Sequence, residues 1–205
     1  MMRWGLIPSW AKDASIGART VNARCETLSE KPAFRAAFKK RRCLVPISGF
    51  YEWKVIEGAA KGKAKQPYYI TSSDGEPLVL AGLWESWRDP SADQAQSIES
   101  FTILTTSPNE LMATFHDRMP VIIPREHFAR WLDPANEDTA SLADLFKPYP
   151  AELMMAMAVS TRVNSPKNDD ALCIEPIRPD PDSRVARGGM ASPTDPQPPE
   201  PGFLF

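Results

Sequence analysis

The feature that most constrains the fold of this chain is a series of five short apolar segments between residues 43 and 106. They are rich in aromatic and β-branched residues, which favour strands, and turn signals such as Asp74-Gly75 lie between them. The segments are residues 43–47, 50–56, 66–71, 78–84 and 101–106. Strands joined by short turns pair with their neighbours, so the sequence predicts a mostly antiparallel sheet.

Four further segments are predicted to be helices that flank this sheet. Each opens with proline, aspartate or a nearby capping residue, and the first has apolar residues at helical spacing. They are residues 32–40, 108–115, 124–132 and 138–146. Strands and helices in this arrangement indicate an α+β fold.

The domain boundary is expected near residue 177. The chain has 205 residues, of which 42% are hydrophobic, and this is enough for one sizeable core. Prolines then crowd the end of the chain from Pro176 onward and leave no room for a regular core. We therefore expect one domain over residues 1–177 and a Pro-rich disordered tail over residues 178–205.

Composition also limits where in the cell the protein is expected. No apolar run reaches the roughly 20 residues that span a membrane. The first residues include Arg3, Trp4 and Pro8 and so lack the continuous apolar stretch of a secretory signal. The three cysteines show neither paired spacing nor a Cys and His cluster. We expect a cytoplasmic monomer with no metal and no cofactor.

The net charge of −2 conceals an uneven distribution of charge. Residues 1–65 contain 14 Lys and Arg against 5 Asp and Glu, whereas residues 66–205 contain 10 against 21. A basic surface can bind phosphates on an acidic protein because salt screens charges beyond about 10 Å. Hydration of a loop explains the lysines of residues 61–65 equally well.

The most informative candidate site is His116-Asp117-Arg118-Met119-Pro120, which holds one of only two histidines. An imidazole that moves a proton near neutral pH, close to a fixed cation, suits chemistry on an anionic substrate. Taken alone, such a histidine is more often a structural hydrogen-bonding residue. Residues 22–27 and 49–53 change that balance, because both place polar residues among apolar or aromatic ones, where burial raises a carboxylate pKa.

These segments resemble the SRAP family, the SOS response-associated peptidases or abasic-site processing proteins. The resemblance covers about 175 residues, and several motifs in one order are far more specific than a single short pattern. The matching segments are residues 4–10, 22–24, 42–46, 49–53, 116–120, 163–164 and 175–176. The resemblance implies a β-barrel-like core flanked by helices.

The resemblance also implies a reaction with single-stranded DNA in the DNA damage (SOS) response. Such proteins capture abasic sites with a cysteine that becomes the N-terminal residue once they remove their own initiator methionine. The free amine of this cysteine condenses with the sugar aldehyde, and its thiol closes a thiazolidine ring. The product is a covalent protein–DNA crosslink.

The roles of the family's residues carry over to five positions. Asn22 is expected to hydrogen-bond the captured sugar, and Glu52 and His116 are expected to move protons during ring opening and imine formation. Arg24 and Arg118 are expected to hold the flanking phosphates. Structural alternatives are a turn former for Asn22, a satisfied buried carboxylate for Glu52, and pairing of Arg24 with Glu26 or Glu52.

Pro8 and Trp10 are expected to contact DNA. In the family, an apolar ridge near this segment presses against bases and favours single-stranded or junction DNA; stacking on a ring contributes about 1 to 3 kcal/mol per base. A buried core tryptophan is an equal alternative, because the sequence alone does not place both Trp4 and Trp10.

The chain departs from the family at its start. Family members begin Met-Cys-Gly-Arg, whereas this chain begins Met1-Met2-Arg3-Trp4. We therefore expect it to lack the family's N-terminal segment and with it the cysteine nucleophile. A non-catalytic single-stranded-DNA-binding module of the same fold is the alternative function.

The remaining cysteines are weaker candidates for a nucleophile. Cys25 lies between Arg24 and Glu26, where a reactive thiolate is conceivable, but a structural role is favoured. Cys43 lies in an apolar run and is expected to be a buried small hydrophobe. A general protease is disfavoured, because the motifs place no Ser, His and Asp or Cys and His set.

Overall fold

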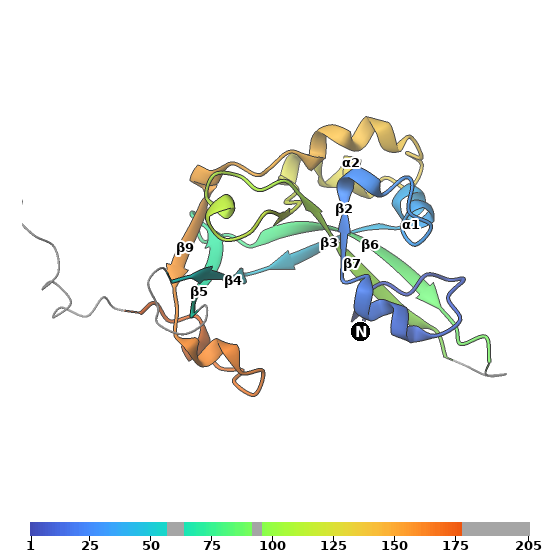
Figure 1. Ribbon diagram of the computed structural model, residues 1–205. Helices are drawn as coiled ribbons and strands as arrows, with labels where there is room; N and C mark the ends of the chain where they lie inside the picture. Colours follow the sequence, from blue (N-terminus) through green and yellow to red (C-terminus); the bar gives the residue numbers. More distant parts are fainter. Residues whose placement is uncertain (57–63, 92–95, 178–205) are drawn as a thin grey trace, which may run out of the picture.

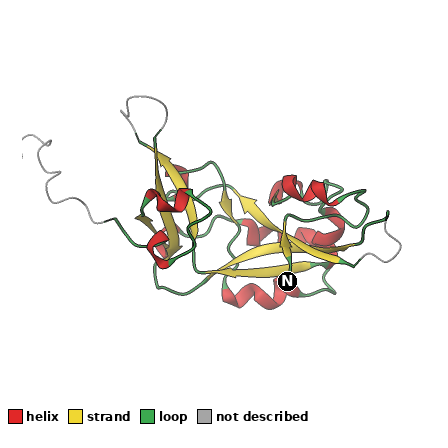
Figure 2. Ribbon diagram, turned by 90° about the horizontal axis from the view of Figure 1, so that it is seen from below, coloured by secondary structure: helices red, strands yellow, loops and turns green. Residues whose placement is uncertain are grey.

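Two curved sheets form a half-barrel with few helices in the computed structural model, which describes residues 1–56, 64–91 and 96–177 (Figure 1). Helices α1 and α2 lie on the larger sheet, and the smaller sheet lies at the other end of an elongated molecule (Figures 1 and 2). The predicted α+β class is confirmed, with an open half-barrel as the core. The predicted Pro-rich tail, residues 178–205, lies outside the described residues.

Both sheets are mostly antiparallel, as predicted, and the five predicted strands correspond to β3 to β7. The exceptions are β1 and β2, which run parallel to β7. The larger sheet contains β1 (Arg3–Trp4), β2 (Asn22–Arg24), β3 (Arg42–Ile47), β6 (Leu78–Trp87), β7 (Ile98–Thr106) and β8 (Met119–Pro120). The smaller sheet contains β4 (Phe50–Val55), β5 (Lys65–Ser72) and β9 (Met154–Ala158).

Strand β7 brings distant parts of the chain together. Strands β1 and β2 pair with one edge of β7, and β6 and β8 pair with the other. Beyond the Gly82–Ile103 pair, β6 and β7 separate and a single extended segment lies between them. Its Val121 amide donates to the Leu104 carbonyl, and its carbonyl accepts from the Ala81 amide, both at 2.9 Å. Two of the sequence motifs, residues 22–24 and 116–120, are thereby held beside the same strand.

Two of the predicted helices are shorter than predicted, whereas residues 125–132 and 139–146 match the predicted bounds to within one residue, and much of the helical structure is 3₁₀. The α-helices are α1 (Arg35–Lys40) and α2 (Phe128–Leu132). The predicted helix over residues 108–115 contains only the 3₁₀ turn η3 (Met112–Thr114), and residues 138–146 form the 3₁₀ helix η5 (Thr139–Phe146). The other 3₁₀ helices are η1 (Ala14–Arg19), η2 (Cys25–Thr27), η4 (Arg125–His127), η6 (Ala151–Leu153), η7 (Thr161–Asn164) and η8 (Ala171–Cys173). Within the described ranges, none of the helices has the length and apolarity needed to cross a membrane.

The main core lies between the larger sheet and its helices. Trp131 of α2 is fully buried there, packs near Phe38 of α1 with ring centroids 6.4 Å apart, and donates from Nε1 to the Cys43 carbonyl at 2.8 Å. Ala23 of β2 and Leu104 of β7 belong to the same buried cluster. Burying a large apolar side chain stabilises a fold by about 1.5 to 3 kcal/mol, so this core rigidly supports the strands that carry the motifs.

Arg42, at the start of β3, is a buried cation that binds backbone carbonyls. Its guanidinium donates to the Phe38 and Lys39 carbonyls at the end of α1 and to the Trp131 carbonyl near the end of α2, at 2.6 to 2.8 Å. It also donates to the carbonyls of Asp133 and Asn136. One side chain therefore satisfies carbonyls that the helix ends leave without an intrahelical partner.

The backbone at Gly5, directly after β1, approaches η1 so closely that we expect no side chain to fit there, which gives a first prediction. Its φ is +109°, and a Cβ at this position would lie 2.5 Å from the Gly17 carbonyl oxygen. We expect Gly5→Ala to lower stability by about 2 to 4 kcal/mol, since it adds a backbone clash to an unfavourable φ. Gly75→Ala is the matched control: its φ is +80° and nothing lies within 4 Å of the added Cβ. Equal urea midpoints for the two variants would contradict the role of the close approach.

Candidate functional site

A cavity of about 620 Å³ is lined by residues of both sheets. Its lining includes five of the seven side chains singled out from the sequence, namely Asn22, Arg24, Glu52, His116 and Arg118. The apolar part of the lining includes Val45, Ile47, Phe50, Leu80 and Ile103. Polar groups that converge on an apolar cavity are typical of a small-molecule or nucleotide site.

Strand β2 supplies Asn22 and Arg24. Its burial alternates, with Ala23 buried in the main core and its two neighbours exposed. Side chains of alternate residues share one face of a strand, so both polar groups lie on the cavity side. Among the described residues, Arg24 has no carboxylate within 4.0 Å, which leaves its charge available to an anionic ligand.

Glu52 supplies a half-buried carboxyl from β4. Burial raises the pKa of Glu52, whereas the charge of protonated His116 and the backbone N–H of Trp53 oppose that rise. A carboxyl with a raised pKa exchanges its proton closer to neutral pH and can act as a general acid or base. Glu52 and His116 both line the cavity.

His116 reaches the cavity from the irregular segment between η3 and β8. Its backbone amide donates to the carbonyl of the fully buried Met112 at 2.9 Å. Its Nδ1 lies 3.0 Å from the backbone N of Arg118 and also 3.0 Å from Oδ1 of Asp117. The amide always carries a hydrogen, so it can donate only to an Nδ1 that carries none. In the neutral ring that accepts this bond, Nε2 carries the ring hydrogen.

Arg118 is held by a carboxylate. Its Nη1 and Nη2 donate to Oε1 and Oε2 of Glu26 at 2.6 and 2.8 Å, and Nη2 also donates to the Thr105 carbonyl at 2.6 Å. The hydrogen bonds from Arg118 lower the pKa of Glu26 from its ordinary value of 4.5 to about 2. The sequence offered Glu26 as a possible partner of Arg24, and in the structure Glu26 pairs with Arg118.

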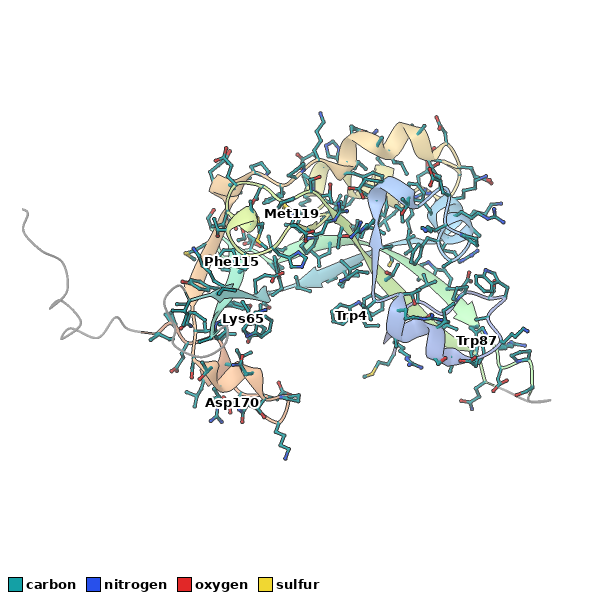
Figure 3. The ribbon with its side chains drawn as sticks, viewed as in Figure 1. Trp4, Lys65, Trp87, Phe115, Met119 and Asp170 are labelled. Atoms are coloured by element: carbon teal, nitrogen blue, oxygen red, sulfur yellow. The ribbon has the colours of Figure 1, made fainter. Side chains whose placement is uncertain are left out.

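Pro8 and Trp10 lie apart from the other predicted residues. Pro8 is buried, and neither residue lines the cavity. The tryptophan that lines the cavity is Trp4, which is 55% exposed and projects from the larger sheet toward the space beside β4 and β5 (Figure 3). Trp4 donates from Nε1 to the Val21 carbonyl at 2.8 Å and stacks on Phe101.

The structure does not activate a thiol at the site. None of the three cysteines lines the cavity, and all three are unpaired. Burial raises the pKa of Cys25, although a hydrogen bond with Thr106 opposes the rise. Burial also raises the pKa of Cys43 to about 11. Both shifts disfavour the thiolate, so the structure does not support a reactive Cys25.

Several lining residues were not singled out from the sequence. They include the aromatic residues Phe101 and Tyr51 and also Thr105. Gly49 is another of these lining residues. A Cβ at this position would lie 2.4 Å from Cζ of Tyr69 and 2.5 Å from the Ile70 carbonyl oxygen, so a larger residue does not fit. Its place in the motif with Glu52 was the available signal. In the described part of the chain, no group of three or more His, Cys, Asp and Glu side chains is arranged to hold a metal ion.

Comparison with known proteins yields one consistent group. The sequence model of a family described as SOS response associated peptidase (SRAP) matches residues 1–166. The abasic site processing protein YoqW of Bacillus subtilis is 47% identical over 174 residues, which are 85% of this chain and 75% of that protein. The abasic site processing protein HMCES of Gallus gallus is 34% identical over 199 residues, covering 86% of this chain and 56% of that protein.

Solved structures agree with these relatives. A crystal structure of a protein from Bacteroides thetaiotaomicron superposes with a TM-score of 0.76 at 34% identity, over 86% of this chain and 76% of that one. A protein from Bordetella bronchiseptica superposes with a TM-score of 0.66 at 31% identity, over 78% of this chain and 76% of that one.

Proposed function

Because this chain belongs to the SOS response associated peptidase (SRAP) family, we propose that it processes abasic sites by binding single-stranded DNA and holding the abasic sugar in the cavity. The observation that carries the proposal is the convergence of Asn22, Glu52 and His116 with the cation of Arg24 on one largely apolar cavity. This function belongs to DNA damage repair, in which a sugar that has lost its base is recognised.

The proposed chemistry begins with opening of the sugar. The closed form is a hemiacetal, and opening it requires removal of the C1′ hydroxyl proton and donation of a proton to the ring oxygen. His116 donates its Nε2 hydrogen to the ring oxygen, and Glu52, whose raised pKa makes it a stronger base, accepts the hydroxyl proton. The product is an aldehyde, which Asn22 holds by a hydrogen bond.

The proposed DNA contacts come from two residues at the cavity. Arg24 binds a flanking phosphate through charge-assisted hydrogen bonds. Trp4 stacks on a neighbouring base with the exposed part of its ring, which its bond to Val21 holds in place. Because stacking on Trp4 requires a base face that no neighbouring base covers, this arrangement favours single-stranded DNA or a junction.

The Trp4 contact gives a second prediction. Trp4→Ala is expected to weaken binding of single-stranded DNA about 5- to 150-fold, which corresponds to one lost stacking contact. Trp10→Ala is the informative comparison, because Trp10 is 59% exposed but lies outside the cavity lining. Fluorescence anisotropy with a labelled oligonucleotide measures both. A larger loss for Trp10→Ala would transfer the stacking role to Trp10.

Covalent capture is the finer part of the proposal. The α-amine of an N-terminal cysteine attacks the aldehyde, the resulting hydroxyl leaves as water, and the thiol adds to the imine carbon to close a thiazolidine. Peptidase activity in this scheme is removal of the protein's own initiator methionine. Residues 1–205 contain no cysteine preceded only by methionine. The three unpaired cysteines are in keeping with action in the reducing cytoplasm.

The test compares the chain of residues 1–205 with a version extended at its N-terminus to a Met-Cys start. Each is incubated with single-stranded DNA that carries one abasic site, and the products are separated on a denaturing gel. We expect anisotropy to show that both bind, and a crosslinked band only with the extended version. A crosslinked band with residues 1–205 alone would assign the capture to another nucleophile, and failure of both to bind would reject the proposal.

A non-catalytic DNA-binding module of the same fold is the second candidate. It is favoured by one observation, that none of the three cysteines lines the cavity. Binding by the extended version with no crosslinked band, and with its methionine intact by mass spectrometry, would establish this alternative.

A further inference from the structure

The Glu26–Arg118 ion pair restrains the Arg118 side chain. The arginine side chain is 16% exposed, and both of its terminal nitrogens already donate to Glu26 or to the Thr105 carbonyl. Its Nε is buried without a partner among the described residues. A guanidinium held in this way forms part of the cavity wall, in contrast to Arg24, whose side chain is exposed on β2.

The backbone amide of Arg118 contacts the His116 ring and bears on which ring nitrogen carries the hydrogen. The Arg118 backbone amide donates to Nδ1 of His116, so the neutral ring carries its hydrogen on Nε2. The carboxylate of Asp117, which is 82% exposed, lies at the same 3.0 Å distance from Nδ1 and would accept a hydrogen from it in the opposite tautomer. The two contacts compete for one ring nitrogen.

Glu26 links the two chain segments beside β7 that supply polar side chains to the cavity. It belongs to η2, which directly follows β2 and its residues Asn22 and Arg24. Its contact with Arg118 spans 92 residues of sequence. The carboxylate therefore connects the strand that carries the sugar and phosphate contacts to the segment that carries the imidazole.

From these contacts we infer that Glu26 is a positioning residue: it fixes Arg118, and the Arg118 amide then holds His116 in the tautomer with hydrogen on Nε2. The importance of this tautomer for DNA rests on the proposed function, in which His116 moves a proton. The positioning itself is a property of the free protein and is tested without DNA.

The test measures the ¹⁵N shifts of the imidazole side chains by NMR at about pH 8.5, where an imidazole is neutral. The chain has only two histidines, so His127 is an internal reference. In the unaltered protein we expect His116 to show a protonated Nε2 and an acceptor Nδ1. Glu26→Ala is expected to shift His116 toward the tautomer that pairs with Asp117 and to leave His127 unchanged.

A double-mutant cycle separates positioning from a general loss of structure. If Glu26 acts through Arg118, adding Glu26→Ala to Arg118→Ala changes the His116 shifts no further. Glu30→Ala is the matched control, because it removes an exposed carboxylate four residues away. Unchanged His116 shifts in Glu26→Ala, or additive effects of the two substitutions, would overturn the inference, even if the protein binds DNA as proposed.

The consequence for the reaction is measured on the extended version with the Met-Cys start. Glu26→Ala is expected to slow crosslinking about 10- to 100-fold, the size of effect that follows a small misplacement of a reacting group, and to leave DNA affinity within about twofold. If the extended protein never crosslinks DNA, the covalent-capture part of the proposed function fails while the NMR test stands. A selective loss of affinity with an unchanged rate would instead assign Glu26 and Arg118 to DNA binding and overturn the inference.

Discussion

Replacing Arg42 with methionine is expected to destabilise the fold by about 3 to 5 kcal/mol. The side chain donates to five backbone carbonyls, and four of them belong to α1 or to the segment at the end of α2. A buried acceptor left without a donor costs about 1 to 3 kcal/mol, and water will reach some of these groups. Because domains are stable by only about 5 to 15 kcal/mol, this loss is large enough to unfold part of the population.

Urea denaturation of three variants tests the role of Arg42. Arg35→Met is the matched control, since Arg35 is an exposed arginine of α1. Arg42→Lys is expected to fall between the control and Arg42→Met, because an ammonium keeps the charge but cannot present the donors of a planar guanidinium. If Arg42→Met and Arg35→Met unfold at the same urea concentration, the carbonyl contacts contribute no net stability.

Replacing Glu52 with glutamine is expected to slow crosslinking by the extended protein about 10²- to 10⁴-fold, the usual contribution of a general acid or base. The same change should raise stability at neutral pH. Burial raises the pKa of Glu52 in the folded state, so the folded protein binds this proton more tightly than the unfolded chain. The associated stability is present below the ordinary pKa of 4.5 and is lost as pH rises through the folded pKa.

Thermal melting between pH 4 and pH 8 separates the two roles of Glu52. The unaltered protein should lose stability relative to Glu52→Gln as pH rises across that window, and the neutral amide should lack this dependence. Greater activity at the expense of stability is typical of a catalytic carboxyl. A variant that crosslinks DNA normally and melts at a lower temperature at pH 7 would identify Glu52 as a structural carboxylate.

The sequence predicted the long strands correctly and missed the short ones for a physical reason. Strands β3 to β7 contain enough aromatic and β-branched residues to be recognised locally. Strands β1, β2 and β8 are two or three residues long and exist because β7 offers them an edge. The helices were recognised mainly by the residues that open them, but such residues do not distinguish an α-helix from the 3₁₀ turn at η3 or the longer 3₁₀ helix at η5.

The sequence motifs supply much of the cavity lining, but they do not encode the direction of each side chain. Asn22, Glu52 and His116 line one cavity, and their roles there stay predictions. Which tryptophan faces the cavity depends on the path of β1, and the sequence analysis named Trp10, whereas Trp4 lines the cavity. The roles of Arg42 and Glu26 rest on contacts across 89 and 92 residues, which no local pattern encodes.

The parallel pairing of β1 and β2 with β7 has a consequence for synthesis of the protein. Residues 3–24 leave the ribosome well before residues 98–106, which form their partner strand. At roughly 5 to 20 residues per second, the early strands wait several seconds without a partner. We therefore expect the cavity to be among the last parts of the nascent chain to form, and the early segment to be a substrate for chaperones in the meantime.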